Sequence, residues 1–411
     1  MATYKKRMGI SVLQAAENRI RYAFAHFDRI YISFSGGKDS SVMFHLVMQE
    51  AMKKNKRVGV LFIDLEAQYK LTIKHVEDMF VMYKDLIDIY WVCLPIKLRN
   101  AVSNYEPVWC AWDPDRKIDW VRDIPSNCIS DVRYFDFFEP GMEFEEFIEL
   151  FAVWYSKGQS TAAFIGIRAD ESLNRYRTIA SSNKETHFGK LWTTKVIDNT
   201  YNIYPIYDWK VSDIWTYHAK YNNLPHNEIY DRMYMAGVSY SQMRLCQPYG
   251  DDQRKGLWLY QILEPHTWGK LIARVNGVNS GSLYINESGN MTGYNKITLP
   301  ANHTWKSFTN LLLSTMPEVT RNHYIERFND WLINWHKRGY TDGIPDEAPR
   351  ELENKSWVPS WRRLCKVLLR NDWWCKGLGL TQPKSEAYGR YLAIKKQKID
   401  NNELGENHGS Q

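Results

Sequence analysis

The segment Ser35–Ser40, with the sequence SGGKDS, combines two glycines, two hydroxyls, a cation and a carboxylate. It follows the apolar run 29–34 and precedes the largely apolar stretch 41–48, a pattern that predicts a strand, a tight turn and a helix. Glycines let the backbone adopt positive φ and approach a ligand closely, and the amide groups at a helix N-terminus attract anions. The sequence therefore predicts a phosphate-binding turn.

The side chains of this turn suit the same chemistry. The hydroxyls of Ser35 and Ser40 and the ammonium of Lys38 can donate to phosphate oxygens, while Asp39 can hold Mg²⁺ or cap the helix. A Walker A loop is excluded, because no glycine stands five residues before Gly37 and because Asp39, rather than Ser or Thr, follows Lys38. A plain Gly-Gly turn with a polar cap is the structural alternative.

A second group of polar residues follows the apolar run 162–167. Arg168 stands directly after this predicted strand, and the segment 166–175 has the sequence GIRADESLNR. Arginine suits a phosphate site because its planar guanidinium binds two phosphate oxygens at once. The alternative is an ordinary helix start in which Glu171 and Arg175 pair at i, i+4, which contributes only about 0.2–0.5 kcal/mol.

Three segments carry a resemblance to a known family. The sequence SFSGGKDSSVM at 33–43 resembles the PP-loop of the N-type ATP pyrophosphatases, in particular of their phosphoadenosine phosphosulfate (PAPS) reductase-like branch. The segment 166–175 resembles the GxRxxES…R element of that branch. The segment 205–215 (PIYDWKVSDIW) resembles its PLxDWxxxDVW element, and Ser212 or Asp208 is expected to cap the helix that begins there. The motifs stand in family order and together cover about residues 11–275.

This resemblance implies binding of ATP or a related adenine nucleotide together with Mg²⁺. It implies that the Ser35–Ser40 turn holds pyrophosphate, that Lys38 and Arg168 stabilise developing phosphate charge, and that Asp39 binds the Mg²⁺ that orients the triphosphate. These three residues are the expected catalytic set, and Asp64 is expected near the ribose or adenine. The implied nucleotide-binding set is Ser33, Ser35, Gly36, Gly37, Lys38, Asp39, Ser40, Asp64, Gly166, Arg168, Glu171 and Arg175.

The chain departs from the sulfonucleotide reductases at the residue that performs their chemistry. Those enzymes attack with the cysteine of a C-terminal Glu-Cys-Gly-Leu-His signature, which this sequence lacks. Cys375 has a lysine neighbour that could lower its pKa, but a buried structural cysteine is the favoured interpretation. The resemblance thus favours an ATP pyrophosphatase that cleaves the α–β bond and adenylylates an acceptor. A PAPS reductase and a non-catalytic, nucleotide-sensing transcriptional regulator are the alternatives.

The wider pattern resembles uncharacterised prokaryotic proteins related to immunoglobulin-binding regulator A, which often neighbour a ParB-like partner. That resemblance leaves open a ParB-like protein or a nucleic acid as partner, and an oligomer. It also leaves open a role in nucleic-acid modification, regulation or phage defence. The identity of the acceptor is not written in the sequence.

Composition narrows the class of protein. The six cysteines are scattered without a CxxC pair, so neither an iron–sulfur cluster nor a zinc site is expected. The formal net charge of +6, with both signs mixed, is too mild to indicate nucleic-acid binding by itself. No run of about 18 apolar residues occurs, and the basic N-terminus lacks the apolar segment of a secretory signal. A cytoplasmic protein without a membrane partner is therefore expected.

The elements that must position these residues alternate between helices and strands. The predicted order is helix 11–27, strand 29–34, helix 41–48, strand 58–63, helix 68–83, strand 87–92, helix 142–157 and strand 162–167. Such alternation predicts an α/β fold, with a parallel twisted sheet that carries helices on both faces. By the resemblance, this is the adenine nucleotide alpha hydrolase-like fold. Ligands of such sheets bind beyond the carboxyl ends of the strands, where the Ser35–Ser40 turn and Asp64 both fall.

Composition also predicts the domain organisation. We expect a nucleotide-binding α/β domain at 1–275 with an insertion near 105–140, a mainly helical C-terminal region at 276–399, and a disordered tail at 400–411. The C-terminal region is expected to hold helices at 305–338, 357–370 and 385–398, after a loop or hairpin at 277–293.

The insertion and the C-terminal region are both dense in tryptophan. We predict that these segments frame the mouth of the nucleotide site for an acceptor or partner. The alternative is that the tryptophans fill a seam between two domains.

Overall fold

The structure is a computed structural model of the 411-residue chain. It describes residues 9–103, 105–181, 184–197, 199–250, 256–278 and 299–381. The chain divides into two compact units, each made of several segments. The first unit comprises Met1–Lys97, Cys110–Gln247 and Leu259–Lys270, and the second comprises Leu98–Trp109, Pro248–Trp258 and Leu271–Gln411. The single domain boundary near residue 275 stays a prediction.

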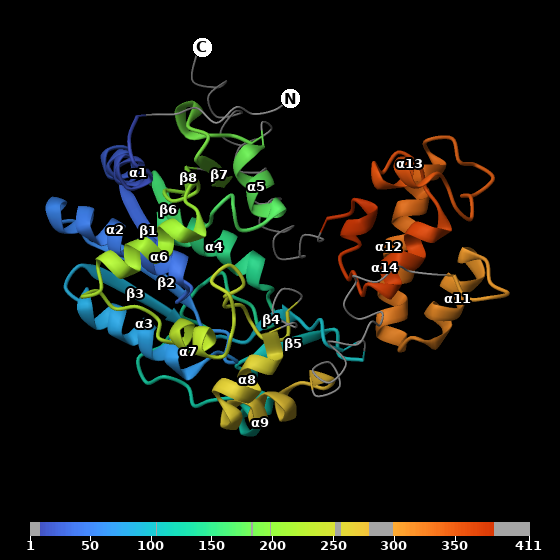
Figure 1. The fold of residues 1–411 in the computed structure, drawn as a ribbon, viewed down its shortest axis with the longest axis horizontal. Coiled ribbons are helices and arrows are strands. Elements are labelled where there is room, and N and C mark those ends of the chain that lie inside the picture. The colour runs from blue at the N-terminus through green and yellow to red at the C-terminus, as the bar shows by residue number, and fades with distance from the viewer. Residues whose placement is uncertain are drawn as a thin grey trace, which may run out of the picture. The chain divides into compact units, whose positions relative to one another are not determined.

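A six-stranded sheet forms the centre of the first unit (Figure 1). Its strands are β1 (Arg29–Ser33), β2 (Val58–Ile63), β3 (Ile87–Val92), β6 (Thr161–Ile165), β7 (Thr193–Ile197) and β8 (Thr200–Ile203). Their order is β3-β2-β1-β6-β8-β7, and all pairs are parallel except β7 with β8. The predicted parallel α/β sheet is confirmed, whereas the β7–β8 hairpin was not predicted.

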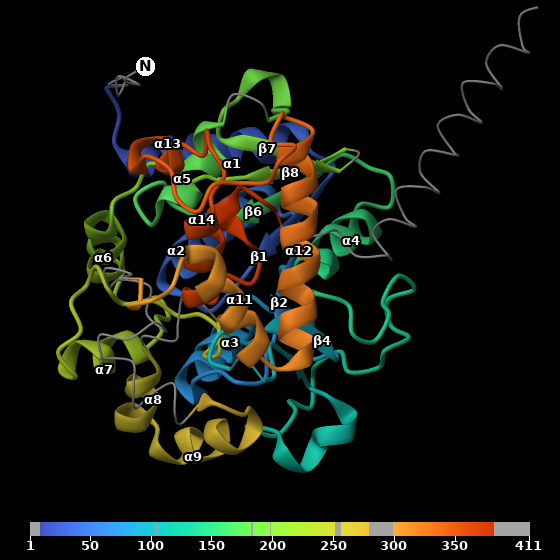
Figure 2. The same ribbon diagram turned by 90° about the vertical axis from the view of Figure 1, so that its right-hand side faces the viewer.

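Helices cover both faces of this sheet, as Figures 1 and 2 show. The α-helices up to residue 235 are α1 (Val12–His26), α2 (Lys38–Lys54), α3 (Lys70–Met82), α4 (Phe144–Ser156), α5 (Leu173–Ala180), α6 (Val211–Lys220) and α7 (Ile229–Met235). Tyr31 of β1 packs edge-on against Phe151 of α4, whereas Phe34 at the end of β1 packs against Phe80 of α3. All six residues of β2 are buried, which explains why the strand is an unbroken apolar run.

The strand order places the predicted site at the centre of the sheet. From β1 the chain continues to β2 and β3 on one side, and it later returns to β6 on the other side of β1. Connections that leave neighbouring strands in opposite directions open a crevice at the carboxyl ends of those strands. The Ser35–Ser40 turn follows β1 and the segment from Gly166 follows β6, so both lie at this crevice.

The starts of two helices differ from the predictions. Helix α2 begins at Lys38, with Gly37 as its N-cap, so Lys38, Asp39 and Ser40 form its first turn. The predicted capping of α6 by Ser212 or Asp208 is wrong. The cap is Lys210, whose backbone N–H donates to the Asp213 carboxylate at 2.7 Å. Asp208 instead forms a bidentate ion pair with Arg19 of α1, which ties α1 to the start of α6.

Within the predicted insertion, β5 (Val108–Ala111) pairs with β4 (Ile96–Arg99), and a 3-10 helix spans Pro114–Asp119. In the first unit, the buried Glu66 orders the part of this insertion near Trp112. Its carboxylate accepts from the backbone N–H groups of Trp112, at 2.7 Å, and of Val121, at 3.1 Å. Backbone hydrogen bonds to a buried acid therefore hold the insertion in addition to its short strand and 3-10 helix.

The second unit contains the C-terminal helices α11 (Trp305–Thr315), α12 (Glu318–His336), α13 (Arg350–Asn354) and α14 (Trp361–Leu369). The predicted helical stretch 305–338 is interrupted near Pro317, which is the N-cap of α12. The buried Glu353 of α13 accepts from Ser360 and from Nε of Arg362, and so fixes α13 to the start of α14. The predicted helix 385–398, the tail at 400–411 and most of the loop 277–293 lie outside the described residues.

Most of the tryptophans of the insertion and of the C-terminal region pack inside the unit to which they belong. Trp331, Trp335 and Trp373 belong to the apolar core of the second unit, and Trp112 is fully buried in the first. Trp357, by contrast, is 63% exposed. The role of these segments at the mouth of a nucleotide site stays a prediction. In the part of the chain that the structure describes, no helix has the length and apolar character needed to cross a membrane.

The hydroxyl of Tyr155 on α4 links the neighbouring strands β1 and β2. It donates to Ile30 O of β1 at 2.8 Å and accepts from Gly59 N of β2 at 3.1 Å. Gly59 leaves the necessary space, because a Cβ there would lie 2.7 Å from the Tyr155 ring.

We predict that Tyr155→Phe lowers the free energy of unfolding by about 0.5–1.5 kcal/mol, because it removes the buried hydroxyl that bonds Ile30 O and Gly59 N. Denaturant unfolding measures this loss, with Tyr134→Phe at a half-exposed ring as the control. An unchanged stability in Tyr155→Phe would show that the hydroxyl does not support the sheet.

Candidate functional site

The two glycines of the turn after β1 predict positive φ angles, and only one of them has such an angle. Gly36 has φ of +71°, whereas Gly37 is extended with φ of −80°. A Cβ on Gly36 would also lie 2.8 Å from Cγ2 of Thr72 on α3. Residue 36 therefore requires glycine for both its conformation and its packing, and the requirement for positive φ does not extend to Gly37.

The hydroxyls of the turn form a short chain. Ser40 Oγ donates to Gly37 O at 2.9 Å, and Ser35 Oγ lies 2.9 Å from Ser40 Oγ. The backbone N–H groups of Ser35 and Gly37 make only long contacts of 3.4 Å, to Ser40 Oγ and Ser35 Oγ respectively. Ser35 and Ser40 therefore lie together as predicted, with backbone donors that are weakly engaged.

Three residues that sequence reasoning missed hold the turn from outside. Asn227 Nδ2 donates to Gly36 O at 2.9 Å, His218 Nε2 contacts Lys38 O at 3.2 Å, and the Tyr230 hydroxyl accepts from Lys38 N at 3.0 Å. They come from α6, α7 and the segment between them, about 180 to 190 residues after the turn. No local spacing in the sequence links them to it.

A serine–histidine pair contacts the backbone of the turn at Gly37. Ser41 Oγ donates to Gly37 O at 2.9 Å and lies 2.7 Å from Nε2 of His75 on α3. Because the serine proton is used on Gly37 O, Nε2 of His75 is the donor in this contact. Burial lowers the pKa of His75 to about 3, so the ring is neutral at physiological pH. We assign this pair a structural role, since both residues are buried.

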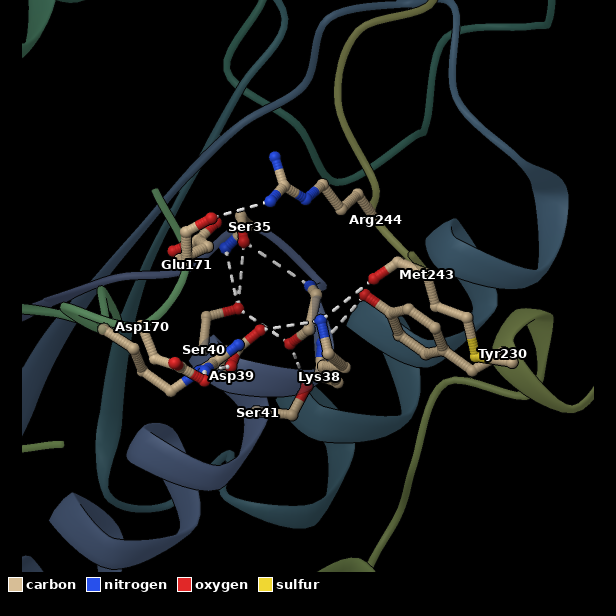
Figure 3. A network of polar contacts seen from close by, with 12 residues as sticks. Ser35, Lys38, Asp39, Ser40, Ser41, Asp170, Glu171, Tyr230, Met243 and Arg244 are labelled. Carbon is tan, nitrogen blue, oxygen red and sulfur yellow. Dashed lines mark hydrogen bonds and ion pairs between the residues drawn. The ribbon is translucent and has the colours of Figure 1, made fainter. Parts of the chain in front are cut away.

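The predicted catalytic residues lie together. Asp39 forms an ion pair with Lys38 at 3.0 Å (Figure 3). It forms a second ion pair with Nε of Arg168. Burial disfavours the charged carboxylate, but the Lys38 and Arg168 charges outweigh burial and hold the pKa of Asp39 below its usual value. Nη1 of Arg168 lies 3.5 Å from Asp170 and has no hydrogen-bond partner within the described residues. Lys38 and Arg168 are therefore both buried cations at the turn.

Gly166 brings the end of β6 against the turn. A Cβ at this position would lie 2.9 Å from Ser40 Cα and 3.1 Å from Ser40 N. Any side chain would therefore push β6 and Arg168 away from the first turn of α2. This close approach gives Gly166 a packing role, and its contact with a nucleotide stays a prediction.

Glu171 and Arg175 make the contacts of an exposed helix start. Arg175 Nε lies 3.9 Å from the Glu171 carboxylate, at i, i+4. The backbone carbonyl of Glu171 accepts from Arg244 at 2.7 Å. Binding of a nucleotide by the Glu171 and Arg175 side chains stays a prediction.

Asp64 is enclosed at the end of β2. Its carboxylate accepts from Trp91 Nε1 at 2.9 Å, from Glu66 N at 3.0 Å and from Arg122. Asp64 is only 1% exposed, so it anchors the segment after β2 to the insertion. Its contact with a ribose or adenine stays a prediction, and its neighbour Leu65 lines the cavity beside the turn.

A cavity of about 140 Å³ opens beside the turn within the first unit. Its lining includes Ser33 and Ser35, and Tyr69 stacks on Tyr260 there at 3.8 Å between ring centroids. Tyr69 is 2% exposed, yet neither its hydroxyl nor Oε1 of Gln68 has a hydrogen-bond partner within the described residues. The cavity is therefore lined by an aromatic pair and by residues whose polar atoms are able to hydrogen-bond a ligand. Its complete lining is Ser33, Phe34, Ser35, Leu61, Ile63, Leu65, Gln68, Tyr69, Thr72, Phe144, Ile148, Leu245, Cys246, Gln247 and Tyr260.

The cysteines are distributed through both units. Cys375 of the second unit is fully buried, and burial raises the pKa of its thiol to about 12, so it is a poor nucleophile at neutral pH. Cys246 is exposed and lines the cavity. No three His, Cys, Asp or Glu side chains among the described residues come together as a metal-ligand set.

The close approach at Gly166 generates a prediction. Gly166→Ala should lower the free energy of unfolding by about 1–3 kcal/mol, because the new methyl group meets the backbone of Ser40. Gly269→Ala in α9 (Pro265–Arg274) is the matched control, since a Cβ there meets nothing within 4 Å. Denaturant unfolding measures both. Equal stability of the two variants would contradict the tight packing of β6 on the turn.

Comparison with known proteins identifies the family. The model for the phosphoadenosine phosphosulfate reductase domain matches residues 29–236, and a domain of unknown function, DUF3440, matches 237–357. The uncharacterized protein YbdN of Escherichia coli (strain K12) is 43% identical over 394 residues, which covers 95% of this chain and 96% of that protein.

Solved structures resemble the chain more distantly. The FMN adenylyltransferase of Candida glabrata, in complex with FAD and inorganic pyrophosphate, is 17% identical with a TM-score of 0.32, and the match covers 53% of this chain and 58% of that one. The PAPS reductase of Candida auris, in a phosphate complex, is 15% identical with a TM-score of 0.27 over 53% of this chain and 85% of that one. The family match and the full-length relative decide the classification: the chain belongs to the phosphoadenosine phosphosulfate reductase domain family.

Proposed function

We propose that the chain binds ATP, or a related adenine nucleotide, with Mg²⁺ and cleaves the bond between its α- and β-phosphates, which releases pyrophosphate and adenylylates an acceptor. The observation that carries this proposal is the convergence of buried Lys38 and Arg168 on the turn that holds Ser35 and Ser40. Among the described residues Nη1 of Arg168 makes no hydrogen bond and only a long ion pair with Asp170, at 3.5 Å, and a buried donor without a hydrogen bond costs about 1–3 kcal/mol. A phosphate oxygen would satisfy it.

In the proposed reaction an acceptor oxygen attacks the α-phosphorus. A new oxygen–phosphorus bond forms while the bond from the α-phosphorus to the α–β bridging oxygen breaks, and pyrophosphate leaves with the bonding electrons. The acceptor proton passes to water. With water itself as the acceptor, the products are AMP and pyrophosphate.

The chain's own residues contribute position and charge. The turn Ser35–Ser40 holds the pyrophosphate portion through its hydroxyls and backbone N–H groups, while Lys38 and Arg168 stabilise the charge that develops on the leaving oxygen. This chemistry needs no covalent nucleophile, which agrees with the buried state of Cys375. The same observation disfavours the PAPS reductase alternative.

Asp39 is the residue that fits Mg²⁺. Mg²⁺ commonly takes one or two carboxylates, keeps several waters and binds substrate phosphates, so one carboxylate beside the turn suffices. Both oxygens of Asp39 pair with cations in this structure, and phosphate oxygens would compete for those cations. Mg²⁺ would supply charge neutralisation between the phosphates.

Several expectations stay predictions: a ParB-like partner, a bound nucleic acid, an oligomer and a cytoplasmic setting. A non-catalytic regulator would bind the same nucleotide without turnover. Chromatography of labelled ATP after incubation with the protein and Mg²⁺ separates the alternatives, because it distinguishes AMP plus pyrophosphate from ADP plus phosphate and from no turnover.

We predict that Asp39→Asn removes the Mg²⁺ dependence of ATP binding and abolishes formation of AMP and pyrophosphate. The amide cannot replace a charged carboxylate as a Mg²⁺ ligand. Calorimetry with and without Mg²⁺ measures the binding. Because the change also leaves two cations without their carboxylate, circular dichroism must establish that the variant is folded. A folded Asp39→Asn protein with wild-type, Mg²⁺-dependent affinity would refute the assignment.

We further predict that Arg168→Lys weakens binding of Mg²⁺–ATP by about 10- to 100-fold, although the charge is retained. A charge-assisted hydrogen bond contributes about 1.5–3 kcal/mol, and a point cation cannot reproduce the planar fork of arginine. Arg57→Lys is the matched control, since Arg57 pairs with Asp88 at the amino ends of the strands. Equal affinities of the two variants would return Arg168 to a structural role.

A further inference from the structure

The segment Met243–Gln247 is assigned differently by the sequence match and by the packing of the chain. By sequence it lies at the start of the matched domain of unknown function, which spans 237–357. By packing it belongs to the first compact unit, which extends to Gln247. These residues are therefore attached to the family domain at 29–236 rather than to the C-terminal helices.

The segment contacts both halves of the candidate site. Lys38 Nζ donates to Met243 O at 3.0 Å, and Met243 is buried. Arg244 Nη2 donates to Glu171 O at 2.7 Å. In Figure 3 the Arg244 side chain extends from Met243 towards Glu171 and Ser35. The segment thus bridges the turn after β1 and the turn after β6.

Arg244 and Arg168 lie in different surroundings. Arg168 is buried and paired with Asp39, whereas Arg244 is exposed and its hydrogen bond to Glu171 goes to a neutral carbonyl. That contact orients the guanidinium without neutralising it. An oriented, exposed guanidinium beside a phosphate-binding turn is suited to binding an anion.

The residues after Arg244 form part of the cavity wall. Leu245, Cys246 and Gln247 line the cavity together with Ser35 and Tyr69. The Tyr69 hydroxyl, on a side chain 2% exposed, has no hydrogen-bond partner within the described residues. A buried hydroxyl of this kind is suited to a hydrogen bond with a molecule bound in the cavity that Tyr69 lines.

We infer that Met243–Gln247 completes the nucleotide site. Arg244 binds phosphate oxygens of the nucleotide, and Leu245–Gln247 cover the part of the ligand that enters the cavity. The inference rests on the proposed function and assigns a ligand-binding role to the first residues of the domain of unknown function. It adds a third cation, Arg244, to Lys38 and Arg168.

Binding of Mg²⁺–ATP, pyrophosphate and adenosine to the full chain tests the inference by calorimetry. Arg244→Ala should weaken binding of Mg²⁺–ATP and pyrophosphate by about tenfold or more, because the variant loses the guanidinium that binds phosphate oxygens. The affinity for adenosine should not change, because adenosine has no phosphate. Arg244→Lys should recover part of the affinity. Arg232→Ala, an exposed arginine on α7, is the matched control and should bind all three ligands as the wild type does.

Thiol labelling gives a second readout. Mg²⁺–ATP should slow the reaction of Cys246 with N-ethylmaleimide, measured by peptide mass mapping, and leave the labelling rate of Cys110 unchanged. If the wild type binds Mg²⁺–ATP but Arg244→Ala binds equally well and Cys246 is not protected, this inference alone is overturned. If the wild type binds none of the three ligands, the proposed function is overturned with it.

Discussion

The ion pairs of Asp39 are the interaction on which the site depends. One carboxylate joins Lys38, in the same first turn of α2, to Arg168 at the end of β6. Removing one member of a buried ion-pair network typically costs about 3–5 kcal/mol, because the remaining charges lose their compensation. The two cations also lower the pKa of Asp39 despite its burial, so the carboxylate is ionised at neutral pH. The positions of both cations are therefore set before any ligand arrives.

The backbone carbonyls of the turn are fixed by side chains from other parts of the first unit. These carbonyl oxygens accept hydrogen bonds from Asn227, His218 and Ser41, and these bonds determine which way the peptide groups face. Burial lowers the pKa of His218 and of His75, so these supports are uncharged near neutral pH. Protonation on acidification would introduce buried charge next to Lys38, and the site would then lose stability as the pH falls below the ordinary histidine value.

The sequence predicts the elements of the first unit well, because apolar periodicity and glycine-rich turns are local signals. The Ser35–Ser40 turn between a strand and a helix follows from such signals, whereas the expectation that Arg168 acts at the same turn came from the family resemblance. The structure places both at the ends of the neighbouring strands β1 and β6. Local signals did not predict three other features of the structure. These are the hairpin β7–β8, the hydrogen bonds of Asn227 and Tyr230 to the turn, and the contact of Met243 with Lys38. The contacts of Asn227, Tyr230 and Met243 join residues about 190 to 205 positions apart, whose pairing is decided by packing and not by spacing. The hairpin is a local pairing of Thr193–Ile197 with Thr200–Ile203 that was not predicted.

The connectivity of the two units sets a limit on how the protein can be divided. The segments 98–109 and 248–258 belong to the second unit, although residues of the first unit precede and follow each of them. A cut at any single peptide bond therefore leaves at least one unit without part of its chain. Mutually interrupted units of this kind are expected to be inherited as one block, so shuffling the helical part onto another α/β domain would require several simultaneous junctions.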